Sequence, residues 1–277
     1  MSNLALSKDR ITFINGDISD PAPVQDALKQ VEVVFHLAAD VKIMKSIDDP
    51  LTNFEVNVRG TLNLLTACVS AKMKRFVYCS SAAVYGEPKR LPVDEEHPLN
   101  PESPYAVSKV AAEKYVCAFH KTYGLPTTCL RFFNVYGPRQ GRSEYASVVP
   151  AFFNSVREGE ALTIFGDGEQ TRDFMYVDDV VRALEIAATR PSAVGQVFNV
   201  ATGKSTSINE LARLVQEVTG KKVGVVHEKP RAGEIKHSWA NVERARELLS
   251  YATQVNLKEG LKSTWGDCTR SMKFKND

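Results

Sequence analysis

Short apolar segments rich in β-branched residues alternate along this chain with longer segments of helical period. Such segments suit strands buried on both faces, so the alternation predicts an α/β fold with helices covering both faces of a parallel sheet. The expected strands are residues 10–14, 31–37, 75–80, 128–133 and 196–200. The expected helices are residues 23–30, 55–72, 103–123, 147–158, 178–188, 207–219 and 241–249.

The pattern loosens from residue 139 onward into glycine-containing loops and separate helices, which predicts a smaller α/β lobe beside the sheet. We expect the sheet domain to comprise residues 1–138 and 172–203, and the lobe to comprise residues 139–171 and 204–277. No linker of low complexity separates these ranges, so the two parts are expected to be interwoven.

Composition narrows the class of protein. With 43% hydrophobic and 25% charged residues and a net charge of +2, the chain is typical of a globular protein and does not indicate a nucleic-acid partner. Its five cysteines lack CxxC spacing, which favours reduced thiols and no metal site. No basic and apolar leader or membrane-length apolar run is present, so we expect no membrane partner and a cytoplasmic location.

Tyr105 and Lys109 lie four residues apart in an expected helix and should share one helix face. A neighbouring ammonium favours the phenolate, so Tyr105 could act as a general base near neutral pH. The alternative is an ordinary helix surface. Tyr85 and Lys89 repeat the spacing, but a glycine and a proline between them break a helix, so we interpret this second pair as turn residues.

Ser81 follows the expected strand 75–80. Ligands of parallel sheets bind at the carboxyl ends of the strands, and a hydroxyl there can relay a proton between a substrate and Tyr105. The alternative is a polar strand terminus without a chemical role. Together, Ser81, Tyr105 and Lys109 are the candidate catalytic residues.

Seven stretches of the chain, two of which contain these candidate residues, carry a family resemblance. They are Phe35-His36-Leu37-Ala38-Ala39, Asn57-Val58-Arg59-Gly60-Thr61, Ser80-Ser81-Ala82-Ala83-Val84-Tyr85-Gly86, Ser103-Pro104-Tyr105-Ala106-Val107-Ser108-Lys109, Leu130-Arg131-Phe132-Phe133-Asn134-Val135-Tyr136-Gly137, Thr171-Arg172-Asp173-Phe174 and Pro230-Arg231-Ala232-Gly233-Glu234. In this order they resemble the extended short-chain dehydrogenase/reductases of the NAD-dependent epimerase/dehydratase family, and among them the UDP-glucose 4-epimerase branch, which also includes UDP-N-acetylglucosamine 4-epimerases. The resemblance implies a Rossmann-type, doubly wound parallel sheet.

The resemblance also implies 4-epimerisation of a UDP-sugar through a 4-keto intermediate, with NAD as cofactor. The residues it implies for cofactor binding are Asp17, Ile18, Leu37, Ala38, Ala39, Asn57, Ser80, Tyr105, Lys109, Phe132 and Val135. Those it implies for substrate binding are Ser81, Asn134, Arg172, Arg231 and Ser238. Arginine suits this role because its planar guanidinium pairs with phosphate oxygens. Relatives often pair through the helices near Glu55 and Ser103, so a homodimer is expected.

Two details refine the expected reaction. Dehydratases and the decarboxylase of this family usually carry an acid soon after the catalytic serine or threonine, where this chain has Ala82 and Ala83. The resemblance therefore favours epimerisation and leaves a dehydratase as a weaker alternative. Ser238 stands where hexose-restricted relatives carry a tyrosine, so we expect a sugar pocket that accepts N-acetylhexosamines.

The chain departs from the family pattern at its N-terminal side. The sixteen glycines include no Gly-x-Gly-x-x-Gly or Gly-x-x-Gly-x-x-Gly spacing, so we expect a truncated chain whose sheet lacks its first βαβ unit. The strand at 10–14 should then either pair beside the strand at 31–37 or remain detached. This departure keeps a second interpretation open, that of a catalytically impaired remnant or nucleotide-sugar-binding module.

Overall fold

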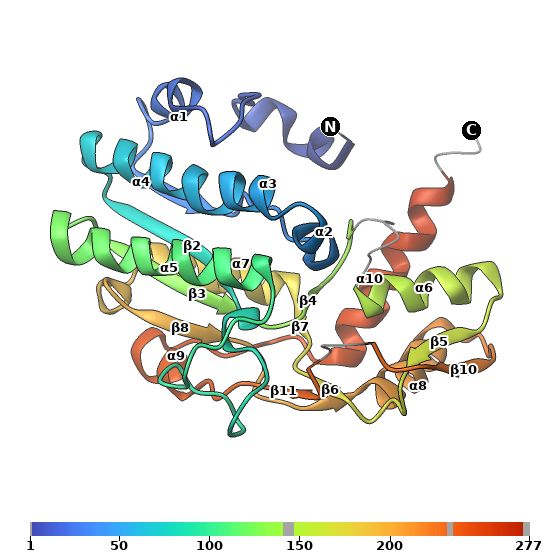
Figure 1. Ribbon diagram of the computed structural model, residues 1–277. Coiled ribbons are helices and arrows are strands. Elements are labelled where there is room, and N and C mark those ends of the chain that lie inside the picture. Colours follow the sequence, from blue (N-terminus) through green and yellow to red (C-terminus); the bar gives the residue numbers. More distant parts are fainter. Residues whose placement is uncertain (1, 141–146, 232–234, 274–277) are drawn as a thin grey trace.

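A four-stranded parallel sheet forms the centre of the computed structural model, which describes residues 2–140, 147–231 and 235–273 (Figure 1). Its strands are β1 (Val33–His36), β2 (Arg75–Ser81), β3 (Thr127–Phe132) and β8 (Val197–Val200), in the order β1-β2-β3-β8. Each neighbouring pair is parallel. Four of the five expected strands are thereby confirmed, with bounds that differ by one or two residues in most cases.

Helices cover both faces of this sheet, as the strand composition predicts. Phe76 and Tyr78 of β2 pack in a cluster with α1 (Pro21–Ala27), α4 (Gly60–Ser70) and α5 (Pro104–Tyr123). Val77, which lies between them and faces the opposite side, packs with α7 (Val177–Thr189) and α9 (Glu243–Leu249). Because side chains alternate along a strand, this division confirms an α/β fold with two covered faces.

The strand expected at residues 10–14 is wrong. Ser2–Arg10 form the 3-10 helix η1, and residues 11–17 have no regular structure, with Phe13 54% exposed. Apolar and β-branched composition cannot make a strand without a hydrogen-bonded neighbour, and this segment does not pair with β1. It is therefore detached, which was the second of the two expected arrangements. Among the described residues, the outer edge of β1 has no partner strand.

Residues 55–70 are helical, as expected for residues 55–72, but the helical run begins earlier in the chain and changes type along its length. The chain forms α2 (Ile43–Asp48) and α3 (Pro50–Phe54), then a π-helical turn η2 (Glu55–Arg59), and continues as α4. By contrast, α5 follows its prediction closely. Ser103 accepts a hydrogen bond from the N–H of Ala106, Pro104 occupies the first turn, and Gly124 ends the helix with φ +68°.

A second cluster of elements lies beside the sheet and has its own core (Figure 1). It contains α6 (Val148–Glu158), α8 (Ile208–Thr219) and α10 (Leu257–Lys273), with β5 (Leu162–Phe165) paired to β10 (Val225–Glu228). Phe152, Leu162, Leu211 and Leu261 are fully buried between them. The helix α10 is not among the helices predicted from the sequence. The division of the chain at residues 138, 171 and 203 stays a prediction.

Short strands join this cluster to the sheet. β6 (Thr171–Arg172) lies between β11 (His237–Ser238) and β9 (Thr206–Ser207), and β4 (Val135–Tyr136) pairs with β7 (Met175–Tyr176). Two short 3-10 helices, η3 (Ala82–Tyr85) and η4 (Pro191–Ala193), complete the described elements.

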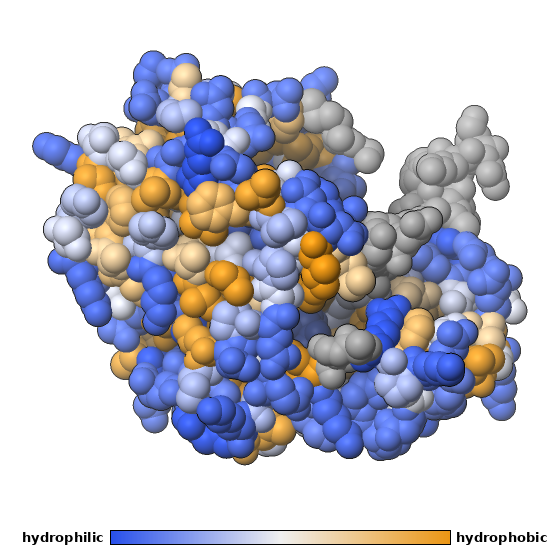
Figure 2. Space-filling view, viewed as in Figure 1, coloured by the Kyte–Doolittle hydropathy of each residue, from blue (hydrophilic) through white to orange (hydrophobic). Residues whose placement is uncertain are grey.

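Part of the surface is apolar. Exposed apolar residues of α3 and α5 include Leu51, Phe54 and Val107, and Figure 2 shows apolar side chains gathered over this group of helices. All five cysteines are free thiols. Within the part of the chain that the structure describes, no helix combines the length and apolar character needed to span a membrane.

Candidate active site

Ser81, Tyr105 and Lys109 meet at the carboxyl end of β2, as their sequence positions predict. Ser81 is the last residue of β2, and Tyr105 and Lys109 lie one turn apart near the start of α5. The side chains of Ser81 and Tyr105 are neighbours at this edge of the sheet. The hydroxyl of Ser81 also accepts the N–H of Ala83 at 3.2 Å, which fixes the rotamer of the serine at the start of η3. This geometry suits proton relay between two hydroxyls.

Lys109 is buried, with 4% of its surface exposed. Its Nζ atom donates to the carbonyl oxygen of Cys79 at 2.5 Å and lies 4.3 Å from the centroid of the Tyr78 ring. Burial lowers the pKa of Lys109 to about 8. The same ammonium contributes to the low pKa of His36, about 3, although burial of the imidazole is the larger cause.

The expected effect of Lys109 on Tyr105 is wrong for this state of the protein. Burial raises the pKa of Tyr105, and the hydrogen bond from Ser81 opposes that rise. Lys109 directs its ammonium to the carbonyl of Cys79 rather than to the phenol. Position on one helix face therefore brought the two residues close, but the strand carbonyl decides where the ammonium points.

Asn57 fixes the loop that follows β1 to the helix that carries Tyr105. Its side chain accepts the N–H of Asp40 at 2.7 Å and donates to the carbonyl of Asp40 at 3.0 Å. It also donates to Ser108 at 2.9 Å, and Ser108 in turn donates to the carbonyl of Tyr105 at 2.8 Å. Because Asn57 is almost fully buried, this set of bonds holds residues 37–40 in a defined position beside the catalytic helix.

A buried ion pair that the sequence analysis missed lies behind the candidate catalytic residues. Glu113 accepts two hydrogen bonds from Arg131, at 3.0 and 2.5 Å, and one from Ser80 at 2.7 Å. Arg131 also donates to the hydroxyl of Tyr85, which donates to Asn199 at 2.6 Å. The available signal was an acid on the apolar face of an expected helix together with an arginine inside an expected buried strand.

The remaining residues predicted for the cofactor are distributed around the sheet edge. Leu37 is exposed. Asp17 lies in an exposed turn, where its carboxylate accepts the N–H of Ser19 at 2.8 Å. Ile18 packs against the core cluster that includes α4. Ala38 and Ala39 follow Leu37 in the loop after β1, and the hydroxyl of Ser80 is committed to Glu113. Phe132 and Val135 are half-buried near the ends of β3 and β4. Their contacts with a cofactor stay predictions.

The predicted substrate residues occupy two neighbouring strands and a loop. Arg172 and Ser238 are direct partners in the parallel pairing of β6 with β11. Asn134 is exposed, and its carbonyl oxygen accepts the N–H of Met175 at 3.2 Å. Arg231 stacks its guanidinium 3.8 Å from the centroid of the Phe165 ring. Their contacts with a substrate stay predictions.

The predicted turn role of the second tyrosine–lysine pair is only half right. Tyr85 ends η3, and Lys89 lies in an irregular segment, so the two do not share a helix face. Tyr85 is nevertheless buried and hydrogen-bonded, so it is a structural residue of the core rather than a surface turn residue.

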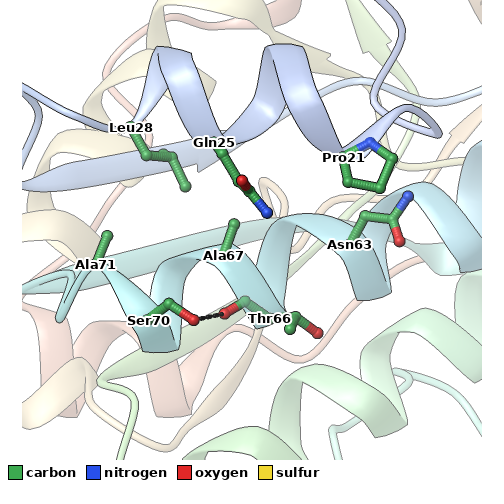
Figure 3. Close-up of a pocket in the computed structure, with 8 residues that line it drawn as sticks. All are labelled: Pro21, Gln25, Leu28, Asn63, Thr66, Ala67, Ser70 and Ala71. Carbon is green, nitrogen blue, oxygen red and sulfur yellow. Dashed lines mark hydrogen bonds between the residues drawn. The ribbon is translucent and has the colours of Figure 1, made fainter.

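A groove of about 480 Å³ lies between α1 and α4, and Ser81, Tyr105 and Lys109 are not among its lining residues (Figure 3). Figure 3 shows Gln25 and Leu28 of the α1 side facing Asn63, Ala67 and other residues of α4. Its lining residues carry no titratable side chain, so it cannot supply the proton transfer that the Ser81 site can. Among the described residues, no group of His, Cys, Asp and Glu has the arrangement of a metal site.

Residues 2–201 match the NAD dependent epimerase/dehydratase family. The chain belongs to this family. A UDP-glucose 4-epimerase of Mycolicibacterium smegmatis is 40% identical over 263 residues, which are 94% of this chain and 83% of the relative. The family assignment thus rests on a match that covers most of both chains.

Solved structures of family members share the fold. The UDP-N-acetylglucosamine 4-epimerase of Methanobrevibacter ruminantium M1, in complex with UDP-N-acetylmuramic acid, has a TM-score of 0.91 and 37% identity, covering 94% of this chain and 84% of that one. The UDP-glucuronic acid 4-epimerase of Bacillus cereus, in complex with UDP-glucuronic acid and NAD, has a TM-score of 0.89 and 32% identity. The match covers 98% of this chain and 86% of that one. Family relatives thus act on different UDP-sugars.

The described residues fit one half of the cofactor of this family. The Tyr105 phenol, the Lys109 ammonium and the loop at 37–40 that Asn57 fixes offer the donors and acceptors that a nicotinamide ribose needs. The described residues beside the open edge of β1 contain no glycine-rich turn of the kind that binds a dinucleotide diphosphate.

Proposed function

We propose that this family member catalyses NAD-dependent 4-epimerisation of a UDP-sugar, N-acetylhexosamines included, through a 4-keto intermediate. The observation that carries the proposal is the proximity of the Ser81 and Tyr105 side chains at the carboxyl end of β2, with the buried ammonium of Lys109 one turn further along α5. When Tyr105 is ionised, the two side chains at this edge can accept and return the proton of a sugar hydroxyl.

Each residue has a distinct task in the proposed reaction. Ser81 binds the 4-hydroxyl of the sugar and relays its proton to the phenolate form of Tyr105, which holds it while C4 is oxidised. Bound NAD would accept the hydride from C4 and return it. The 4-keto sugar then turns to present its other face, and Tyr105 gives the proton back through Ser81. Lys109 would hold the nicotinamide ribose.

The residues after Ser81 favour epimerisation over elimination. Ala82 and Ala83 occupy the start of η3, where an acid or base would be needed to remove water from the neighbouring carbons of the sugar. Dehydration is therefore the weaker alternative. We further propose that Arg172, Asn134 and Arg231 bind the diphosphate and that Ser238 leaves space for an N-acetyl group.

The test is interconversion of UDP-N-acetylglucosamine and UDP-N-acetylgalactosamine by the purified protein supplied with NAD, followed by chromatography. The expected result is approach to the same mixture from either sugar. A protein that binds both NAD and the UDP-sugar but gives no conversion would contradict the proposal.

A nucleotide-sugar-binding module without turnover is the second candidate. The open edge of β1 favours it, because Leu37, predicted to lie beside the cofactor, is 58% exposed there. Acid release of small molecules from the purified protein, followed by an assay for NAD, separates the two candidates. Stoichiometric NAD supports the epimerase, and its absence together with tight UDP binding supports the module.

We propose in addition that the chain forms a homodimer through α3, α4 and α5. Exposed apolar residues on α3 and α5, Leu51, Phe54 and Val107 among them, support this face. Sedimentation of the wild type should give a dimer, and Leu51→Asp should give a monomer. A wild-type monomer at micromolar concentration would contradict this part of the proposal.

A further inference from the structure

Asp173 is a fully buried carboxylate whose partners are mainly backbone N–H groups. One of its oxygens accepts the N–H of Thr202 at 2.9 Å and the hydroxyl of Thr202 at 2.5 Å. The other accepts the N–H of Gly203 at 2.9 Å and the N–H of Ala240 at 3.4 Å. An ionised carboxylate accepts several such bonds well, and together they offset the cost of burying its charge.

These four bonds join three segments that are far apart in the sequence. Asp173 directly follows β6, Thr202 and Gly203 follow the outermost sheet strand β8, and Ala240 lies two residues beyond β11. The carboxylate therefore fastens the strand pair β6–β11 to the end of the central sheet. Among the described residues, the other hydrogen bond of Thr202, which its hydroxyl accepts from the N–H of Lys204, does not reach these two strands.

The strand pair that Asp173 fastens carries two proposed substrate residues. Arg172 and Ser238 are register partners across β6 and β11. Asp173 directly follows Arg172, and its carboxylate accepts the N–H of Ala240, two residues after Ser238. The segment that follows Asp173 also contacts the third proposed substrate residue, because the N–H of Met175 donates to the carbonyl of Asn134. The position of these side chains relative to Ser81 and Tyr105 thus depends on how this segment sits on the sheet.

We infer that Asp173 is a positioning residue for substrate binding, one that holds Arg172 and Ser238 at the distance from the catalytic hydroxyls that a UDP-sugar requires. The inference rests on the proposed function, because it assumes that Arg172 meets the diphosphate. Asp173 itself touches no substrate and acts only through the two strands that it joins.

Asp179 is a matched control for a purely structural effect. It is also fully buried, accepts the N–H groups of Gln254 and Val255 at 3.0 and 3.2 Å, and pairs with Arg182. It fastens α7 to the segment before α10 rather than to the substrate strands. Asn is isosteric with Asp but offers only one acceptor oxygen, so Asp173→Asn and Asp179→Asn should both lower thermal stability.

The first measurement is hydrogen exchange of the unliganded protein at a temperature where both variants are folded. Asp173→Asn should accelerate exchange in the peptides covering residues 200–204 and 238–241, and Asp179→Asn should leave them unchanged. Unchanged exchange at 238–241 in Asp173→Asn would overturn the inference. This result does not depend on any ligand.

The second measurement is calorimetric binding of UDP. Asp173→Asn should weaken binding about tenfold, the effect of losing one hydrogen bond to a charged group, while Asp179→Asn should change it less than about threefold. In an Arg172→Ala background, Asp173→Asn should add less than about threefold, because the residue acts through Arg172. Equal losses in the two Asn variants, or an undiminished loss in the Arg172→Ala background, would overturn the inference. Failure of the wild type to bind UDP would count against the proposed function, and the exchange result would still decide the role of Asp173.

Discussion

The side chains of Ser81 and Tyr105 are neighbours across the gap between the end of β2 and the first turn of α5. The 3-10 helix η3 and a long loop separate the strand from the helix along the chain, and the sheet edge brings their polar ends together. Because Tyr105 is buried, its phenol has few partners other than this serine and whatever enters the site. The relation makes the tyrosine the first residue to test.

Tyr105→Phe should reduce epimerisation by about 10²-fold to 10⁴-fold, because a positioned acid–base group contributes a factor of that size. The affinity for UDP should remain within about threefold, since the phenol meets the sugar and not the nucleotide. Tyr123→Phe is the control, because Tyr123 is an exposed tyrosine of the same helix. Steady-state rates and calorimetry give both quantities. A Tyr105→Phe protein with wild-type turnover would exclude the proposed base.

The buried ammonium of Lys109 predicts a pH-dependent contribution to stability. Burial lowers its pKa from 10.5 to about 8, so between these values the unfolded chain binds the proton and the folded one does not. Stability from this group therefore rises with pH from about 8 to about 10.5, by an amount on the order of 3 kcal/mol.

Urea unfolding of the wild type and of Lys109→Met across pH 7 to 10 measures this contribution. The free energy of unfolding should increase with pH more steeply in the wild type than in Lys109→Met, where the titrating group is gone. Lys114→Met, which removes an exposed lysine of the same helix, should keep the wild-type slope. Parallel slopes for wild type and Lys109→Met would show that the ammonium is solvated.

Breaking the ion pair of Glu113 and Arg131 should be costly. Glu113→Gln leaves the buried guanidinium of Arg131 without its countercharge and weakens the bond from Ser80, so we expect a loss of about 3 to 5 kcal/mol in the free energy of unfolding. Glu55→Gln removes the exposed pair with Arg59 and should cost less than about 0.5 kcal/mol. Urea unfolding measures both. Similar small losses would mean that Arg131 finds another partner.

Ser238→Tyr should narrow the proposed sugar pocket. A phenol at this position should weaken binding of UDP-N-acetylglucosamine about tenfold or more while leaving UDP-glucose within about threefold, because only the N-acetyl group needs the space. Ser238→Ala is the control and should bind both sugars as the wild type does. Calorimetry with each UDP-sugar reports the ratio without requiring turnover. An unchanged ratio in the tyrosine variant would place Ser238 outside the pocket.

Local sequence was sufficient to predict a helix or strand where the hydrophobic periodicity and the signals at the ends of the element agree. The strands at β2, β3 and β8 and the helix α5 follow from apolar runs, the cap at Ser103 and the stop at Gly124. The spacing of Tyr105 and Lys109 places both on one face of α5, and the position of Ser81 after a strand places it at the carboxyl edge. These features depend on neighbours within a few residues, so the sequence contains them directly.

Only the tertiary structure decided which distant segments of the chain contact one another. The composition of residues 10–14 suits a strand, but a strand needs a hydrogen-bonded neighbour, and none accompanies this segment. The direction of the Lys109 ammonium, the pairing of Glu113 with Arg131, and the bonds of Asp173 to Thr202 and Ala240 all join elements whose separation along the chain carries no signal of contact. Burial removes water from these polar groups, so each must find a partner in the fold, and only the packed chain determines which one.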